Sequence, residues 1–436
     1  MSLDCCDPRC ETPGHAGLSR RRFPTWGSAV GGGLLLAAGG VTGRLAFGTP
    51  NDPSAGDTLV VLFLRGGADG LSLVPPFGEQ SYYDLRPGIA VPRPGQANGA
   101  LDLNGFFGLH PAMAPLYDGP WSRGQLAVVN ATGWPREVTT TRSHFEAQDY
   151  WERSSTSPGV RSGWVARHLA GIGAADPVPA LGWGSSLQVS LRGFPGSLST
   201  GRLNSFGLRG FPSGDVDEVE AALATMYAAA PAPLGTTATA LLGAIDAMAG
   251  AVDIPPGNGV TYPSNGLSTS LREVAQVIRA NVGLRAAALD VGGWDLHDDM
   301  GTAADGPMAG RAGQVAEALA AFADDLGPLL DEVSVVVMSE FGRTSKENGN
   351  GGTDHGRGSS MLLMGGGIRG GLYGEWPTLL DDTDPDRDLT VTTDFRTVLA
   401  ELLTVRLQNP AVDQVFPGFT APTALGIAEP ETVAAG

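Results

Sequence analysis

Short apolar runs alternate along this chain with segments in which apolar residues recur every three or four positions. Five of the runs are almost continuously hydrophobic and end in glycine or polar clusters: Thr58–Leu64, Gln125–Asn130, Ala286–Val291, Val333–Ser339 and Ser360–Met364. A strand covered on both faces of a parallel sheet is apolar at nearly every position, whereas a half-exposed strand alternates. The five runs therefore predict buried parallel strands.

Helical spacing lies between the runs. One face of a predicted helix collects Met308, Ala312, Val315, Leu319, Phe322 and Leu326. The same spacing recurs at Leu271, Val274, Ile278 and Val282, and again at Phe395, Leu399 and Leu402. Strands that alternate with helices predict an α/β fold, in which a mostly parallel central sheet has helices on both faces. Because ligands of such sheets bind beyond the carboxyl ends of the strands, polar residues that follow strands are the first candidates for a site.

The N-terminus carries the basic cluster Ser19-Arg20-Arg21-Arg22-Phe23 directly before a Gly/Ala/Leu-rich stretch at about 29–47. This is the layout of an export signal, and the paired arginines resemble the twin-arginine signature. Many glycines and Arg44 disfavour a membrane-spanning helix in the stretch. We expect a leader at 1–48 that the twin-arginine machinery exports to the periplasm, cell envelope or exterior. A single domain at 49–436, with no stable membrane span, would remain.

Removal of this leader would change the chemistry available to the protein. All three cysteines, Cys5, Cys6 and Cys10, lie within it, so the mature chain has neither disulfides nor a thiolate metal site. The leader also contains five arginines and three carboxylates, and its removal changes the net charge from −18 to −20. A surface with this net negative charge repels nucleic acid, and we therefore expect no nucleic-acid partner.

Polar residues with metal-binding chemistry follow four of the predicted strands. They are Asp69, Asp295, His297, Glu340, Asp354 and His355. For Asp69 alone, an Asx-type turn is the alternative explanation. Of the six histidines in the chain, one lies in the leader, and three of the remaining five are His144, His297 and His355. Carboxylates combined with imidazoles suit a divalent cation such as Zn, Mn, Mg or Ca. The acidic run at 381–386 lacks the glycine and final glutamate of an EF-hand, and we interpret it as a solvated turn.

Ser143 is followed three residues later by Glu146, a spacing typical of a capping box that begins a helix running through Trp151. A hydroxyl at a helix N-terminus also lies in a field that favours an anion. Ser143 is therefore either a helix cap or a nucleophile or anion-site residue. No Gly-x-Ser-x-Gly pattern surrounds it, which disfavours a serine hydrolase.

Five segments, in chain order, carry a family resemblance: FLRGGADGL at 63–71, SHFEAQDYW at 143–151, GGWDLH at 292–297, SEFGRT at 339–344 and TDHG at 353–356. They resemble the domain-of-unknown-function family 1501, a set of twin-arginine-exported bacterial proteins. That family is itself similar to the alkaline phosphatase/sulfatase superfamily. The resemblance implies an alkaline-phosphatase-like fold and a metal-dependent hydrolase or transferase of phosphate or sulfate esters, with a small-molecule or glycan ester as substrate.

The resemblance also implies roles for particular residues. The metal ligands would be Asp69, Asp295, His297, Glu340, Asp354 and His355. Ser143 would be the nucleophile, with Thr141 as second choice, and the substrate would be bound by Arg65, Arg142, His144 and Arg343. In one alignment Glu340-Phe341 take the place of the superfamily's Asp-His pair, and in the other Asp354-His355 are that pair and the last His is missing. In both alignments the predicted set is one imidazole short. A single metal, or a pair held by more oxygen ligands, is therefore expected. A non-catalytic exported binding protein is the alternative.

Overall fold

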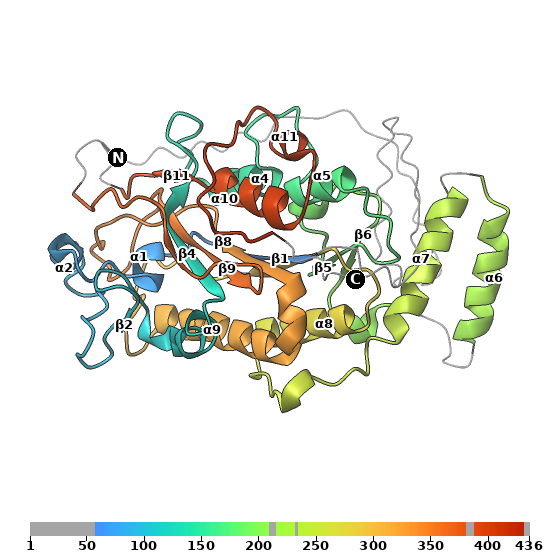
Figure 1. Cartoon of the computed structure of the whole chain (residues 1–436), viewed down its shortest axis with the longest axis horizontal. Helices are drawn as coiled ribbons and strands as arrows, with labels where there is room; N and C mark the ends of the chain where they lie inside the picture. The colour runs from blue at the N-terminus through green and yellow to red at the C-terminus, as the bar shows by residue number, and fades with distance from the viewer. Residues whose placement is uncertain (1–56, 209–214, 232–233, 381–387, 431–436) are drawn as a thin grey trace, which may run out of the picture.

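The computed structural model describes residues 57–208, 215–231, 234–380 and 388–430 (Figure 1). The predicted leader at 1–48 and the acidic run at 381–386 lie outside these residues. Among the helices that the structure describes, none is both long and apolar enough to cross a bilayer.

A nine-stranded sheet forms the centre of the described chain, in the order β10-β4-β9-β8-β1-β7-β5-β6 with β11 paired to β4 (Figure 1). Its strands are β1 (Thr58–Leu64), β4 (Leu126–Gly133), β5 (Ala180–Trp183), β6 (Ser197–Thr200), β7 (Ala286–Val291), β8 (Val333–Met338), β9 (Ser359–Gly365), β10 (Gly371–Tyr373) and β11 (Thr393–Asp394). Strand β9 is antiparallel to β4 and β8, and the other pairings of this sheet are parallel. A separate ribbon pairs β2 (Leu101–Asp102) with β3 (Gly108–Leu109).

Helices cover both faces of the sheet (Figure 1). One face carries α8 (Gly266–Arg279) and α9 (Pro307–Leu326), and the other carries α4 (His144–Arg153), α5 (Trp164–Gly171), α10 (Phe395–Glu401) and α11 (Val412–Val415). The pair α6 (Val216–Ala228) and α7 (Leu234–Ala249) lies beyond the β6 edge. Shorter helices are α1 (Gly70–Leu73), α2 (Gln80–Leu85) and α3 (Ala114–Leu116), with 3₁₀ or π turns at 111–113, 117–121, 189–191, 203–205, 257–259, 327–332 and 402–406.

Strand β1 shows why the two helical layers are held together. Its residues alternate between two hydrophobic clusters, because successive side chains of a strand point to opposite faces. Val60, Leu62 and Leu64 join the cluster on the α8 and α9 side. Leu59, Val61 and Phe63 join the cluster that contains Trp151 and Phe395. Each such side chain stabilises the fold by about 1.5–3 kcal/mol relative to exposure to water, so the sheet is fixed on both faces.

The predicted fold class is confirmed, as are the five predicted strands. One detail is wrong, because β9 runs antiparallel to its neighbours. A continuous apolar run shows that a strand is buried but carries no information about its direction. The antiparallel direction matters for the site, because β9 begins at the edge of the sheet where β8 ends. The loop between them, 339–358, therefore stays at that edge.

Candidate metal centre

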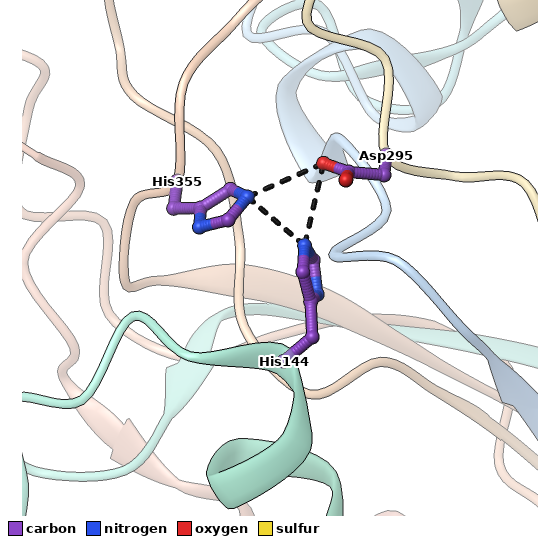
Figure 2. Close-up of side chains that lie close together, drawn as sticks. All are labelled: His144, Asp295 and His355. Carbon is purple, nitrogen blue, oxygen red and sulfur yellow. Dashed lines mark hydrogen bonds and ion pairs between the residues drawn. The ribbon is translucent and has the colours of Figure 1, made fainter. Parts of the chain in front are cut away.

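Three segments that are far apart in the sequence meet at the carboxyl end of the parallel strands. His144 is the first residue of α4, which follows β4. Asp295 follows β7, and His355 lies in the loop between β8 and β9. Figure 2 shows the three side chains pointing toward one another from these separate segments. The predicted location of the site, beyond the strand ends, thus agrees with where these side chains gather.

The ligand atoms of these residues form a compact triangle (Figure 2). His144 Nε2 lies 2.9 Å from His355 Nε2, and Asp295 Oδ1 lies 3.3 Å from His144 Nε2 and 3.2 Å from His355 Nε2. Ligands of a tetrahedral ion with bonds of about 2.0–2.1 Å are separated by roughly 3.3 Å. The triangle therefore has nearly the size of three corners of a tetrahedron. The fourth corner would be free for water or substrate, as in catalytic sites.

The other ring nitrogen of each histidine fixes its tautomer. Nδ1 of His355 lies 2.7 Å from the carbonyl oxygen of Arg142, an atom that only accepts. Nδ1 of His144 lies 2.8 Å from Glu340, and Nδ1 of His297 lies 3.0 Å from Asp354. Each Nδ1 is therefore a donor, and in the neutral ring each Nε2 is left with a lone pair. Asp295 Oδ1 lies 3.0–3.3 Å from each Nε2 and would accept from it if the ring were protonated. An imidazole whose second nitrogen is held by a carboxylate or carbonyl is the usual arrangement of a metal-ligating histidine.

In the neutral tautomers these lone pairs face one another. Two Nε2 atoms 2.9 Å apart cannot hydrogen-bond when both are acceptors, and the nearby oxygen of Asp295 adds negative charge. A cation bound at the centre would remove this repulsion. The donor set, two imidazoles and a carboxylate, fits a divalent ion such as zinc or manganese. We conclude that these residues fit a metal ion by geometry, by tautomer and by chemistry.

His297 lies on the outer side of this group. Its Nε2 is 2.9 Å from His355 Nε2 and 3.0 Å from Asp295 Oδ1. However, the three ligand atoms that all lie within 4.8 Å of one another are those of His144, Asp295 and His355. His297 thus borders the centre, and more than a third of its side chain is exposed to solvent. A side chain in this position can contact a substrate as well as an ion.

Glu340 was predicted to be a ligand, but the structure places it behind His144. Its Oε1 accepts hydrogen bonds from His144 Nδ1, the backbone N–H of Gly66 and the side-chain amide of Gln148, each at 2.8 Å. Burial alone would raise the pKa of Glu340, but the hydrogen bonds from His144 and Gln148 outweigh it and lower the pKa below its ordinary value. The ionised carboxylate therefore orients His144. Its hydrogen bonds also raise the pKa of His144.

Arg343 holds Asp295 in place. The guanidinium is buried and donates to the carbonyl oxygens of Gly66, Gly67, Trp294 and Thr353 as well as to the carboxylate of Asp295. Burial acts to raise the pKa of Asp295, yet Arg343 overcomes this and lowers it to about 2. Because its N–H groups are engaged in this way, Arg343 is a positioning residue and not the predicted substrate clamp.

Gly66 allows the loops around Arg343 to approach closely. Its φ is +119°, and a Cβ atom at this position would lie 2.6 Å from the backbone nitrogen of Asp295. Only glycine satisfies both constraints. The same residue donates its N–H to Glu340, so the turn after β1 supports both the Asp295 loop and the orientation of His144.

Asp69 and Arg65, also predicted site residues, have other partners. Asp69 is buried and pairs with Arg86, whose NH2 lies 3.1 Å from Asp69 Oδ1, and it accepts a hydrogen bond from Ser72. In the part of the chain that the structure describes, its carboxylate makes none of the contacts that join the histidines. Arg65 pairs with Glu152 and Asp290. Both residues therefore stabilise the turn and helix next to the centre.

The segment before α4 differs from its prediction in its capping. The helix begins at His144 with Ser143 as N-cap, as predicted, but the side chain of Ser143 makes no capping hydrogen bond. Glu146 instead accepts from Thr141 Oγ1 at 2.7 Å, so the reciprocal capping box is wrong. The side chain of Arg142 pairs with Asp388, and its backbone carbonyl oxygen lies within hydrogen-bond distance of His355 Nδ1. The side chain of Ser143 thus makes no capping hydrogen bond, and Ser143 directly precedes His144 of the candidate centre.

Three supporting residues were missed by the sequence analysis. Gln148 follows His144 by four residues, a spacing that puts both on one face of a helix and could have indicated a shared partner. Phe341 packs with its ring centroid 4.8 Å from that of His144 and 5.0 Å from that of His355. Phe341 therefore forms an apolar wall against the rings of His144 and His355. Arg86 gave no signal in the sequence.

Comparisons with known proteins give one family match and several weak structural similarities. Residues 216–408 match the model of a family described as Protein of unknown function (DUF1501), a region that contains Asp295 and His355 but not His144. No curated protein matches the sequence. The PH0037 protein from Pyrococcus horikoshii is similar over 72% of this chain and 87% of its own, with 13% identity and a TM-score of 0.25. The alkaline phosphatase from the Antarctic bacterium TAB5 is similar over 73% of this chain and 94% of its own, with 12% identity and a TM-score of 0.27. Similarity at this level says nothing about what this chain binds or catalyses.

Proposed function

We propose that this protein is a metal-dependent hydrolase or transferase of phosphate or sulfate esters, with the ion held by His144, Asp295 and His355. The observation that carries the proposal is the convergence of the Nε2 atoms of His144 and His355 and a carboxylate oxygen of Asp295, which lie 2.9–3.3 Å from one another. Each imidazole is fixed from behind by an acceptor, which is the arrangement that a metal ion requires.

A bound divalent ion would act as a Lewis acid and stabilise the charge that develops on the ester oxygen. The chain's own residues supply the remaining roles. Ser143 Oγ would attack phosphorus or sulfur, and the ester bond to the leaving oxygen would break. The hydroxyl proton would pass to His297 Nε2, since the Nδ1 of that ring is held by Asp354, and from there to the leaving oxygen as the alcohol departs. Water, or an acceptor alcohol, would then attack the ester on Ser143, give its proton to His297 and restore the serine hydroxyl. The N-terminus of α4 favours the anionic group beside Ser143.

We further propose that the protein acts outside the cytoplasm. Support comes from the basic Ser19–Phe23 cluster, the weakly apolar stretch that follows and the confinement of all cysteines to the predicted leader. The twin-arginine machinery exports folded proteins, so a metal ion could be bound before export. This order of events would protect the centre from competing ions outside the cell.

A second function, ligand binding without catalysis, is favoured by one observation. The three arginines predicted to bind the anion are all engaged, Arg65 with Glu152 and Asp290, Arg142 with Asp388, and Arg343 with Asp295. A phosphate or sulfate group would therefore have to rely on the ion and the α4 N-terminus for its positive partners. The two functions differ in whether a bound ester is cleaved.

Activity assays on metal-loaded protein distinguish them. We expect turnover of an aryl phosphate or an aryl sulfate that falls at least about a hundredfold in Ser143→Ala and in His355→Ala. Ser270→Ala, on the exposed side of α8, serves as the matched control and should retain wild-type turnover. Folded, metal-loaded wild-type protein that cleaves neither ester would exclude the hydrolase and leave the binding function.

A further inference from the structure

A groove of about 510 Å³ opens on the outer side of α4. Its walls come from α4 and the turn that follows, and they include Phe145, Glu146, Asp149, Tyr150, Arg153 and Thr156. Five of these residues recur along one face of the helix at intervals of one, three or four positions. The volume falls in the range of small-molecule sites. Nothing in the proposed metal chemistry uses this groove.

Phe145 is the feature that marks the groove as a binding surface. Of the large hydrophobic side chains that the structure describes, it is the most exposed, at 89%. Phe145 directly follows His144, so one residue of the groove and one residue of the candidate metal centre share the first turn of α4. Tyr150, a second aromatic residue of the groove, packs partly against the core and is therefore held rigidly. An apolar ring kept in water beside a reactive centre favours a ligand that covers it.

The charges of the groove exclude most ionic ligands. Asp149 is paired with Arg153 one helical turn later, which leaves the pair neutral. Glu146 lies in the first turn of α4, where the positive end of the helix offsets its charge, and it accepts a hydrogen bond from Thr141. An anion finds no free cation here, and a cation finds little uncompensated charge. The groove instead offers hydrogen-bond donors and acceptors around aromatic rings.

We propose that this groove binds a neutral sugar residue of the substrate. A sugar ring has an apolar face that can cover Phe145, and its hydroxyl groups can both donate and accept. Carboxylates of Glu146 and Asp149 would accept hydrogen bonds and the hydroxyl of Thr156 would donate one, while Arg153 is buried and already donates to Asp149, Ser157 and Val160. This inference rests on the proposed function in one respect, which is that the ester group of the bound sugar molecule would lie at His144. The substrate class is accordingly a phosphate or sulfate ester of a carbohydrate.

Sugar binding can be measured without any ester. Saturation-transfer NMR and calorimetric titration of the full-length protein with cellotriose, maltotriose and xylotriose should show binding of at least one of them. Phe145→Ala should weaken that binding about tenfold, and Phe145→Trp should restore it, because an aromatic face is retained. Met226→Ala, on the exposed side of α6, is the control at another exposed apolar residue and should bind as wild type does.

The outcomes separate this inference from the proposed function. Sugar binding that persists in His355→Ala and in the presence of a chelator supports the groove as a sugar site. If no ester is cleaved in the same experiments, only the proposed hydrolase function is contradicted. Wild-type protein that binds none of the three sugars overturns the inference. So does binding that is unchanged in Phe145→Ala. A dimer that sedimentation detects in wild type and not in Phe145→Ala would also overturn it, because the groove would then be an interface between copies of the chain.

Discussion

Replacement of Glu340 by glutamine tests whether the residue behind His144 controls metal affinity. The carboxylate accepts three hydrogen bonds on Oε1, from His144, Gly66 and Gln148, and one on Oε2 from Ser339. Glutamine keeps the shape but removes the charge, so the bond to His144 weakens from a charge-assisted to a neutral one. Such substitutions behind a ligating histidine cost about 10–100-fold in metal affinity, equivalent to about 1.4–2.7 kcal/mol.

The assay is a competition titration with a chromophoric chelator, carried out on protein shown by circular dichroism to be folded. Glu401→Gln is the matched control, because Glu401 is also buried and accepts backbone N–H groups from the segment 425–428. Glu401→Gln should lower the free energy of unfolding without changing metal affinity. Wild-type affinity in folded Glu340→Gln would refute the role that we assign to this carboxylate, and an equal loss in both variants would refute its specificity.

Three further predictions follow from the contacts. Arg343→Lys loses the planar guanidinium that donates to several carbonyl oxygens and to Asp295, and it should lower the free energy of unfolding measured in urea by about 3 kcal/mol. The control Arg369→Ala removes an exposed ion pair and should lower the free energy of unfolding by under about 0.5 kcal/mol. The pKa of Asp295 is lowered from 3.8 to about 2, so in metal-free protein its stabilisation is complete above pH 3.8 and is lost as the pH falls toward 2. Asp295→Asn should lack that part of the acid-induced loss, and an identical pH profile would contradict it. Export of the full-length chain should fail when Arg20 and Arg21 are both replaced by lysine, as fractionation would show, and unaffected export would exclude the twin-arginine route.

The strands were predictable because buried strands leave a strong signal in the sequence. The runs that became β1, β7 and β8 are apolar throughout, and their boundaries follow from the polar residues after them. The location of the site followed from the same pattern, since residues beyond parallel strands gather at one edge. Strand direction was not predictable for β9, because it depends on which neighbours a strand finds in the folded sheet.

The division of roles among the polar residues was less predictable. His144 was assigned to substrate binding, because the order of motifs pointed to Ser143 beside it, yet its ring reaches the centre from the first turn of α4. Asp69 has the position of a ligand in the sequence, but its partner Arg86 lies 17 residues later and shares no motif with it. A carboxylate that binds an ion and one that accepts a hydrogen bond from a ligating histidine differ in position by only about 3 Å. The fold of loops such as 339–358 sets this position, and the sequence pattern does not show it.

The central claim is that His144, Asp295 and His355 bind one divalent ion. Crystals of the protein grown with zinc or manganese, and measured at the absorption edge of the metal, test it most directly. The account predicts an anomalous peak about 2.1 Å from His144 Nε2, His355 Nε2 and an oxygen of Asp295, and loss of that peak in His355→Ala. Fully folded protein with no peak at these three residues, or with its peak elsewhere in the chain, would contradict it.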